Sequence, residues 1–122
     1  MQRVSWTFLS NHAHVLVCLA RDRDARLRDV ADLVGITERA VFKIVTELEA
    51  AGVVWRTKEG RRNHYHLDTS VRLRHPLEGN RSVASLLLSL LEPQEAKQLG
   101  LGAGSRAKQA AAQTQRRKKE KQ

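Results

Sequence analysis

The amino-acid sequence predicts a mainly α-helical domain with a small β-hairpin, in the order α-α-α-β-β-α, followed by a disordered basic tail. Apolar residues recur at helical spacing up to residue 51, and the pattern changes to a two-residue period between residues 53 and 67. After residue 92 the chain has no aromatic or β-branched residue except Thr114, so it lacks the side chains that build a core. Because 122 residues suffice for one domain, we expect a domain at 1–92 and a tail at 93–122.

The first helix is predicted over residues 12–20, after Ser10 or Asn11, since either residue can cap a helix. Val17 and Cys18 make the side opposite its main stripe apolar as well. Such a helix needs two packing partners, which we expect to be the domain core and either the C-terminal helix or a second subunit. The preceding segment is expected to lead into the same layer with Trp6, Phe8 and Leu9.

Two further helices are predicted over residues 27–34 and 38–51. The first of these has the i, i+3, i+4, i+7 apolar spacing of a short amphipathic helix, and Gly35 ends it. Thr37 is the expected N-cap of the second, and Gly52 closes it. Two helices joined by a short turn that contains glycine form a helix-turn-helix.

A β-hairpin is predicted over residues 53–67, around Glu59 and Gly60. The connection is either a two-residue turn or a slightly longer loop with Gly60 at positive φ. The second strand alternates, which places two sets of side chains on opposite faces: Asn63, Tyr65 and Leu67 on one, and Arg62, His64 and His66 on the other.

A loop over 68–79 precedes a last helix at about 81–91. Leucines surround the axis of this helix almost completely, which is more apolar surface than one small domain needs to bury. We therefore expect a homodimer whose interface includes Leu86, Leu87, Leu90 and Leu91.

The segment from Val30 to Val45 carries the most specific motif. Ala31 lets two helices cross closely, Gly35 takes a backbone angle that is costly for other residues, and Val41 with Ile44 locks the second helix onto the first. Followed by the hairpin, this segment resembles the winged helix-turn-helix of bacterial transcriptional regulators of the MarR and ArsR type. The resemblance covers roughly residues 6–91, and it implies binding of double-stranded DNA, with helix 38–51 in the major groove and wing 53–67 on the backbone or in the minor groove.

Candidate DNA-binding residues lie at the start of helix 38–51 and on its side opposite the expected buried stripe, which consists of Val41, Ile44, Val45 and Leu48. These residues are Thr37, Glu38, Arg39, Phe42, Lys43 and Thr46. Arg39 points outward in the first turn, where it can reach a guanine edge or a phosphate. Phe42 has two readings: it meets a thymine methyl group, or it packs against the wing or the first helix.

Basic residues also gather at the wing tip and in the tail. Lys58, Arg61 and Arg62 have the spacing a hairpin needs to straddle a phosphate backbone. The net charge of the chain is +9, and residues 103–122 hold seven basic residues and one acid. This tail either adds sequence-independent DNA affinity or serves solubility.

Other function classes lack the residues they need. His14 with Cys18 and His64 with His66 could each supply two metal ligands, but neither pair is completed nearby in the sequence, so we expect no metal and no cofactor. No phosphate-cradling loop or nucleophile–base pair indicates an enzyme. One cysteine, no signal sequence and no apolar run of membrane-spanning length indicate a cytoplasmic protein without membrane contact.

Two questions stay open at this level. A winged-helix module that binds only proteins or RNA, with the tail supplying the charge, is an alternative to a regulator that reads DNA. A small-molecule effector is not indicated, because the short flanking segments do not favour a ligand cleft.

Overall fold

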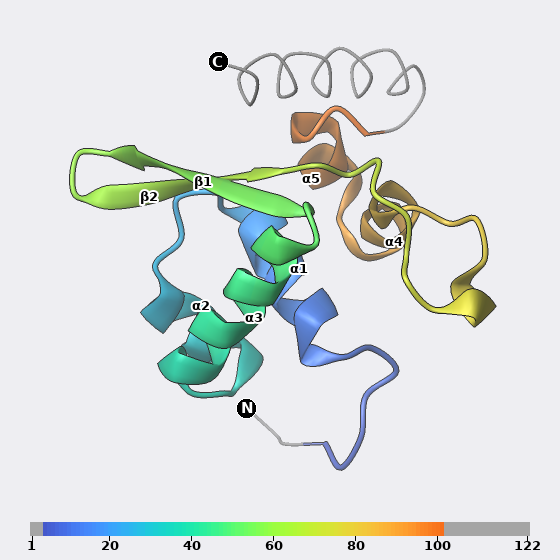
Figure 1. The fold of residues 1–122 in the computed structure, drawn as a ribbon, viewed down its shortest axis with the longest axis horizontal. Coiled ribbons are helices and arrows are strands. Elements are labelled where there is room, and N and C mark those ends of the chain that lie inside the picture. Colours follow the sequence, from blue (N-terminus) through green and yellow to red (C-terminus); the bar gives the residue numbers. More distant parts are fainter. Residues whose placement is uncertain (1–3, 102–122) are drawn as a thin grey trace.

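The computed structural model describes residues 4–101. Three helices come first: α1 (Asn11–Arg21), α2 (Leu27–Val34) and α3 (Glu38–Ala50). A hairpin of β1 (Val54–Glu59) and β2 (Arg62–Leu67) follows, then the short 3-10 helix η1 (Pro76–Glu78) and the helices α4 (Val83–Leu90) and α5 (Pro93–Gln98). This mainly helical order with one antiparallel hairpin is the predicted fold class, and it is compatible with a winged helix (Figure 1).

The turn between α2 and α3 forms where glycine and threonine were expected to shape it. Gly35 has φ of 86°, a left-handed conformation that costs glycine little. Its N–H donates to the Ala31 carbonyl at 2.8 Å, and the next N–H, of Ile36, donates to the same carbonyl at 3.1 Å. Thr37 then caps α3, because its hydroxyl oxygen accepts from the N–H of Ala40 at 3.0 Å. The chain therefore reverses between the two helices with its backbone groups paired.

The hairpin has a two-residue connection, Gly60 and Arg61, with Glu59 opposite Arg62. Gly60 has φ of 66° and Arg61 does not have positive φ, as in a type II′ turn. Cross-strand partners share a face, so the register puts Trp55, His64 and His66 together and Tyr65 on the opposite face. The predicted alternation along β2 is confirmed.

The core lies where α1 packs against α2, α3 and α4, and the inner face of the hairpin closes it. Its most deeply buried side chains come from every one of these elements: Val15, Leu19, Val30, Val41, Val45, Val54, Tyr65 and Leu87. Apart from Tyr65 these are aliphatic residues, as the low aromatic content of 4% led us to expect. The wing extends away from this core on one side, and α4 lies on the other (Figure 1).

The C-terminal boundary was predicted too early. Instead of disorder from residue 93, the structure has α5, which begins with Pro93 in the first turn, where its missing N–H costs nothing. Glu92 caps it reciprocally, and the Glu92 N–H donates to Glu95 Oε1 at 2.9 Å. Ala96 and Leu101 are buried in the core. Of the predicted tail, residues 102–122 lie outside the described part of the chain.

Two expectations about apolar packing need correction. Trp6 and Phe8 do not enter the helical layer, because they are largely exposed and make an edge-to-face contact with each other at 4.9 Å. On α4, Leu87 is fully buried and Leu91 is nearly so, which makes both part of the core of a single chain. One face of α4 therefore packs inward, and of its leucines only Leu88 is exposed, at 45%. None of the helices within residues 4–101 is long and apolar enough to cross a membrane.

Candidate nucleic-acid interface

The second helix of the helix-turn-helix has a buried side and a solvent side. Val41, Ile44, Val45 and Leu48 are buried, and this is the predicted inward stripe. All six residues predicted for DNA contact are exposed: Thr37, Glu38, Arg39, Phe42, Lys43 and Thr46. The hydroxyl groups of Thr37 and Thr46 are already engaged by the backbone, since Thr46 donates to the Phe42 carbonyl at 2.9 Å. Arg39 and Lys43 are therefore the residues of this set whose hydrogen-bond donors have no partner within residues 4–101.

Phe42 is 51% exposed and does not belong to the apolar residues packed on the core. Of its two predicted roles, this placement favours the one in which its ring stays available at the surface. An exposed aromatic ring beside Arg39 and Lys43 can contact an apolar group such as the methyl of thymine.

The formal charge of α3 is negative, because it holds three glutamates against Arg39 and Lys43. Two of the glutamates have partners on neighbouring elements. Glu47 Oε1 lies 3.1 Å from His12 Nε2 on α1, and Glu49 Oε2 lies 3.2 Å from Arg56 Nε on β1. Arg39 and Lys43 make no hydrogen bond or ion pair within residues 4–101. The outer face of α3 therefore offers two cations, Arg39 and Lys43, that no acidic side chain within residues 4–101 engages.

The wing carries four basic residues and one acid over residues 54–67. Lys58 and Arg61 are exposed and, within the described part of the chain, have no ionic partner. Arg62 is different, because its guanidinium donates to the Asp24 carbonyl at 2.6 Å. Of the three wing residues predicted to contact DNA, Lys58 and Arg61 therefore have charges without a partner in this part of the chain, and Arg62 anchors the hairpin.

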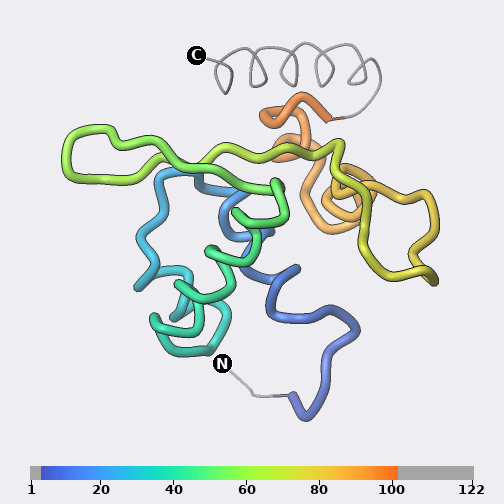
Figure 2. The backbone as a smooth tube through the Cα atoms, viewed as in Figure 1, coloured from blue at the N-terminus to red at the C-terminus, as the bar shows by residue number. Residues whose placement is uncertain are grey.

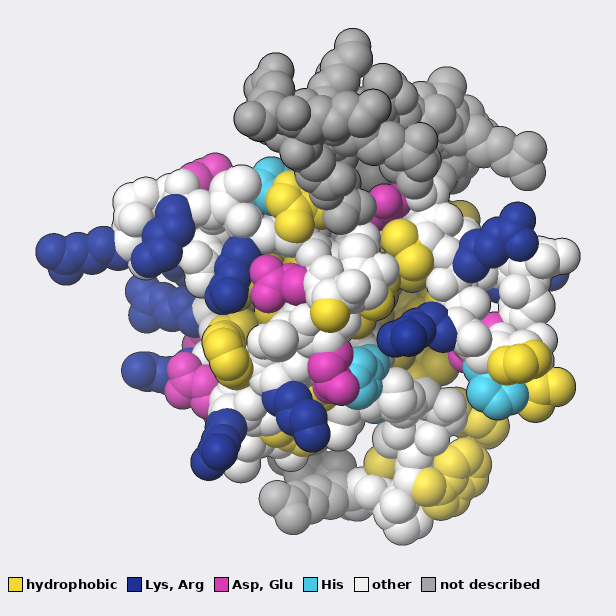
Figure 3. Space-filling view, in the orientation of Figure 1, with side chains coloured by type: hydrophobic (Ala, Val, Ile, Leu, Met, Phe, Trp, Pro, Cys, Tyr) yellow, Lys and Arg dark blue, Asp and Glu magenta, His cyan; other side chains and the backbone are white. Residues whose placement is uncertain are grey.

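Both parts of the predicted interface lie toward one side of the molecule. In Figure 1 the wing tip and the first turns of α3 both lie toward the left. Figure 3 shows Lys and Arg side chains gathered along that edge, with single acidic groups between them. The described domain therefore has a basic edge formed by the wing and the helix-turn-helix.

Asp24, in the loop between α1 and α2, holds the wing in place. Its carboxylate Oδ1 lies 2.6 Å from Nδ1 of His64, and the N–H of Tyr65 donates to the Arg23 carbonyl at 2.8 Å. Figure 2 shows this loop running beside the hairpin. The hydrogen bond from His64, aided by nearby Arg62 and Arg23, lowers the pKa of the Asp24 carboxyl below its ordinary value. Sequence reasoning missed these contacts, because no motif links Asp24 to residues about forty positions away.

The histidines of the wing are held by ring contacts. His66 stacks on Trp55 with ring centroids 5.0 Å apart and meets His64 edge-on at 4.9 Å. Thr57 Oγ1 lies 3.0 Å from His66 Nε2. The predicted pairing of His64 with His66 on one face is confirmed, but the nearest charged neighbour of His64 is Asp24, which the sequence did not indicate.

His14 and Cys18, the other pair considered as metal ligands, are not part of the three-residue ligand group found within residues 4–101. His14 Nδ1 lies 3.3 Å from the side chain of Asn11, and Cys18 is half-buried on α1. Burial raises the pKa of the Cys18 thiol, which the charge of Arg21 partly offsets. This thiol is therefore a packing group with little thiolate at neutral pH.

On the opposite side from the wing, an open groove of about 490 Å³ lies between α1, the end of α3 and the loop before α4. Leu16, Leu48 and Val83 are among its apolar lining residues, and Arg72 and Arg74 are among its charged ones. Phe8 lies at the groove and is 91% exposed. The sequence did not predict this hollow, because it forms between segments whose contacts are not local.

Comparisons with known proteins give no relatives: no protein-family model, no curated protein and no solved structure matches the chain.

Proposed function

We propose that the protein is a sequence-specific transcriptional regulator that binds double-stranded DNA. In this proposal α3 enters the major groove and the hairpin lies on the backbone or in the minor groove. The supporting observation is that Arg39 and Lys43, on the solvent side of α3, have no charged partner within residues 4–101, and that the first turns of α3 lie toward the same side as the basic wing (Figure 1).

Each part of the basic edge has a separate task. Arg39 and Lys43 supply hydrogen-bond donors to base edges or phosphates, and the partial positive charge at the start of α3 adds to them. Lys58 and Arg61 neutralise phosphates, which gives affinity without sequence information. Arg62 and Asp24 keep the wing at a fixed position relative to α3 through their hydrogen bond.

The test compares two arginines after a preferred duplex has been selected from genomic fragments. Arg39→Ala should weaken binding to this duplex by about 1–3 kcal/mol and reduce the preference over random DNA. Arg61→Ala should weaken binding to all sequences alike. Arg81→Ala is the matched control, because it removes the same charge from an exposed site just before α4. Equal affinity of wild type and Arg39→Ala for the preferred duplex would contradict the assignment.

A protein-binding module is the second candidate, and a specific observation favours it. Trp6, Phe8 and Leu77 are exposed apolar side chains, and Phe8 lies at the groove. Figure 3 shows apolar side chains gathered on the side away from the wing. If the protein binds neither random nor selected duplexes at low salt, while Phe8→Ser removes binding of a protein partner, this second function replaces the first.

A further inference from the structure

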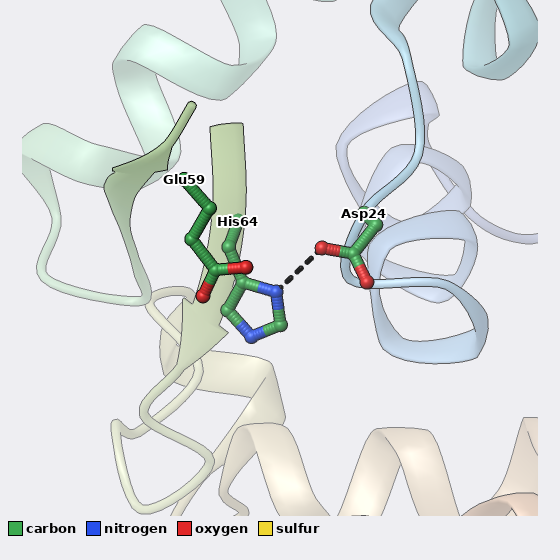
Figure 4. A group of neighbouring side chains, drawn as sticks. All are labelled: Asp24, Glu59 and His64. Atoms are coloured by element: carbon green, nitrogen blue, oxygen red, sulfur yellow. Dashed lines mark hydrogen bonds and ion pairs between the residues drawn. The ribbon is translucent and has the colours of Figure 1, made fainter. Parts of the chain in front are cut away.

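Three side chains of types that can bind a metal ion meet between the outer half of the wing and the loop that precedes α2. Asp24 comes from the loop between α1 and α2, Glu59 from the end of β1 and His64 from β2. One ligand atom of each lies within 4.8 Å of the others (Figure 4). We propose that these three residues bind a divalent first-row transition metal ion, which joins the wing to the loop before α2.

The donor set fits this class of ion. One imidazole nitrogen and two carboxylate oxygens are ligands of Zn²⁺ and of its neighbours Mn²⁺, Fe²⁺ and Co²⁺. Three protein ligands leave coordination positions for water, and the site is open enough to admit it, since Asp24 and Glu59 are exposed and His64 is half-buried. The two carboxylates also offset the charges of Arg62 and Arg23, the two arginines near Asp24.

The spacing requires a limited rearrangement of the three side chains. Three ligand atoms about 2.1 Å from one ion lie about 3.0–3.6 Å from each other, so a separation of up to 4.8 Å has to shrink by about an ångström, and the 2.6 Å pair of Asp24 and His64 has to open slightly. Glu59 is exposed at the end of a strand and can make this adjustment by side-chain rotation. Figure 4 shows its carboxylate and that of Asp24 beside the same imidazole ring.

The backbone holds two of the ligands in advance. The Tyr65 N–H donates to the Arg23 carbonyl at 2.8 Å, which fixes the strand next to the loop. Arg62 adds a second link, to the carbonyl of Asp24 itself, at 2.6 Å. Since neither link uses a ligand atom, Asp24 and His64 stay together when the ion enters.

The ion would take the place that a proton now holds. Asp24 Oδ1 and His64 Nδ1 are 2.6 Å apart, joined by a hydrogen bond. Ligation through Nδ1 needs that nitrogen without its proton, so Nε2 then carries the only N–H of the ring. Asp24 and His64, now joined by a hydrogen bond, would then be two of the metal ligands, and Glu59 would be the third.

Zinc titration of the full-length chain by calorimetry, with Co²⁺ absorption spectra as a second readout, tests the site. We expect one saturable zinc site per chain. Glu59→Gln and His64→Gln should each weaken zinc binding by about tenfold or more while thermal unfolding of the metal-free protein stays cooperative. His12→Gln is the matched control, because His12 makes a similar pair with Glu47 at 3.1 Å but does not belong to such a three-residue group.

Two outcomes would overturn the proposal. One is the lack of saturable binding at millimolar zinc. The other is binding that Glu59→Gln leaves unchanged, because the ion would then lie elsewhere in the chain.

A second measurement concerns regulation and rests on the proposed function. A metal ion that ties Glu59 and His64 to the loop restricts the wing relative to α3, so zinc should raise affinity for the preferred duplex in the wild type and not in Glu59→Gln. Zinc binding without any effect on DNA affinity would remove this regulatory role and leave the metal site intact. Zinc binding in a protein that does not bind DNA would contradict the proposed function alone.

Discussion

Side chains of the candidate interface divide into those that hold the fold and those that remain available. Thr37 caps α3 and Arg62 anchors the wing, whereas Arg39, Lys43 and Arg61 have no hydrogen-bond partner for their side chains within residues 4–101. Helical periodicity was enough to predict that Arg39 and Lys43 are exposed. The tasks of Arg62 and Asp24 depend on a contact across 38 positions of sequence, which local patterns do not encode.

The cap at Thr37 gives a prediction about stability. Thr37→Ala should lower the free energy of unfolding by about 1 kcal/mol, because the N–H of Ala40 loses its acceptor. Thr46→Ala is the comparison, since its hydroxyl bonds to a carbonyl inside the helix and alanine is the better helix former. Urea unfolding of both variants should separate them, and equal midpoints would show that the cap contributes nothing.

At the scale of elements, the sequence predicted the helices α1 to α4 and both strands to within one or two residues, but not the short η1, which lies within the expected loop 68–79. The helices follow from repeated apolar spacing, and the hairpin follows from alternation around Gly60. Helix α5 was missed because it is six residues long and its small apolar residues give no period. The available signal was at its start, where Glu92, Pro93 and Glu95 form a capping pattern.

Truncation tests whether α5 belongs to the domain. A chain that ends at Leu91 loses the buried side chains of Ala96 and Leu101, and also the Glu95 partner of Arg21 at 3.3 Å. Burial of one leucine contributes about 1.5–3 kcal/mol, so the truncated chain should unfold at lower urea concentration than one that ends at Gly102. Identical unfolding curves of the two truncated chains would show that α5 does not contribute to the stability of the domain.

The buried positions of Leu87 and Leu91 change which residues of α4 and its C-terminal end we expect in a dimer interface. Leu87 is fully buried, so Leu87→Ala should destabilise the chain by about 2–5 kcal/mol whatever its oligomeric state. We expect a dimer to use the outer side of α4, where Leu88 is 45% exposed and Leu86 and Leu90 are half-buried. In sedimentation the wild type should then be a dimer and Leu88→Lys a monomer, while Leu77→Lys, an exposed leucine on η1, should leave the dimer intact. A monomeric wild type at tens of micromolar would contradict this expectation.

Charge is distributed over the whole molecule in two parts that should act differently on DNA. Residues 1–102 place uncommitted cations on α3 and the wing, and residues 103–122 add seven basic residues and one acid. Phosphate neutralisation releases counterions, so each cation that contacts DNA steepens the fall of affinity with salt, whereas contacts to base edges give preference between sequences. A charge count from the sequence cannot separate these roles, but a salt series can.

We therefore expect a chain that ends at Gly102 to keep its sequence preference and lose salt dependence. Plotted as the logarithm of affinity against the logarithm of salt concentration, each lost phosphate contact reduces the slope by about 0.9. Fluorescence anisotropy with the preferred and a random duplex, over a range of salt concentrations, measures both quantities. The ratio of the two affinities should match that of the full chain, because Arg39 and Lys43 remain in the truncated protein. If the salt dependence of DNA affinity did not change, the tail would serve solubility. If the truncated chain lost its preference for the selected duplex, α3 would not be the element that recognises the DNA sequence.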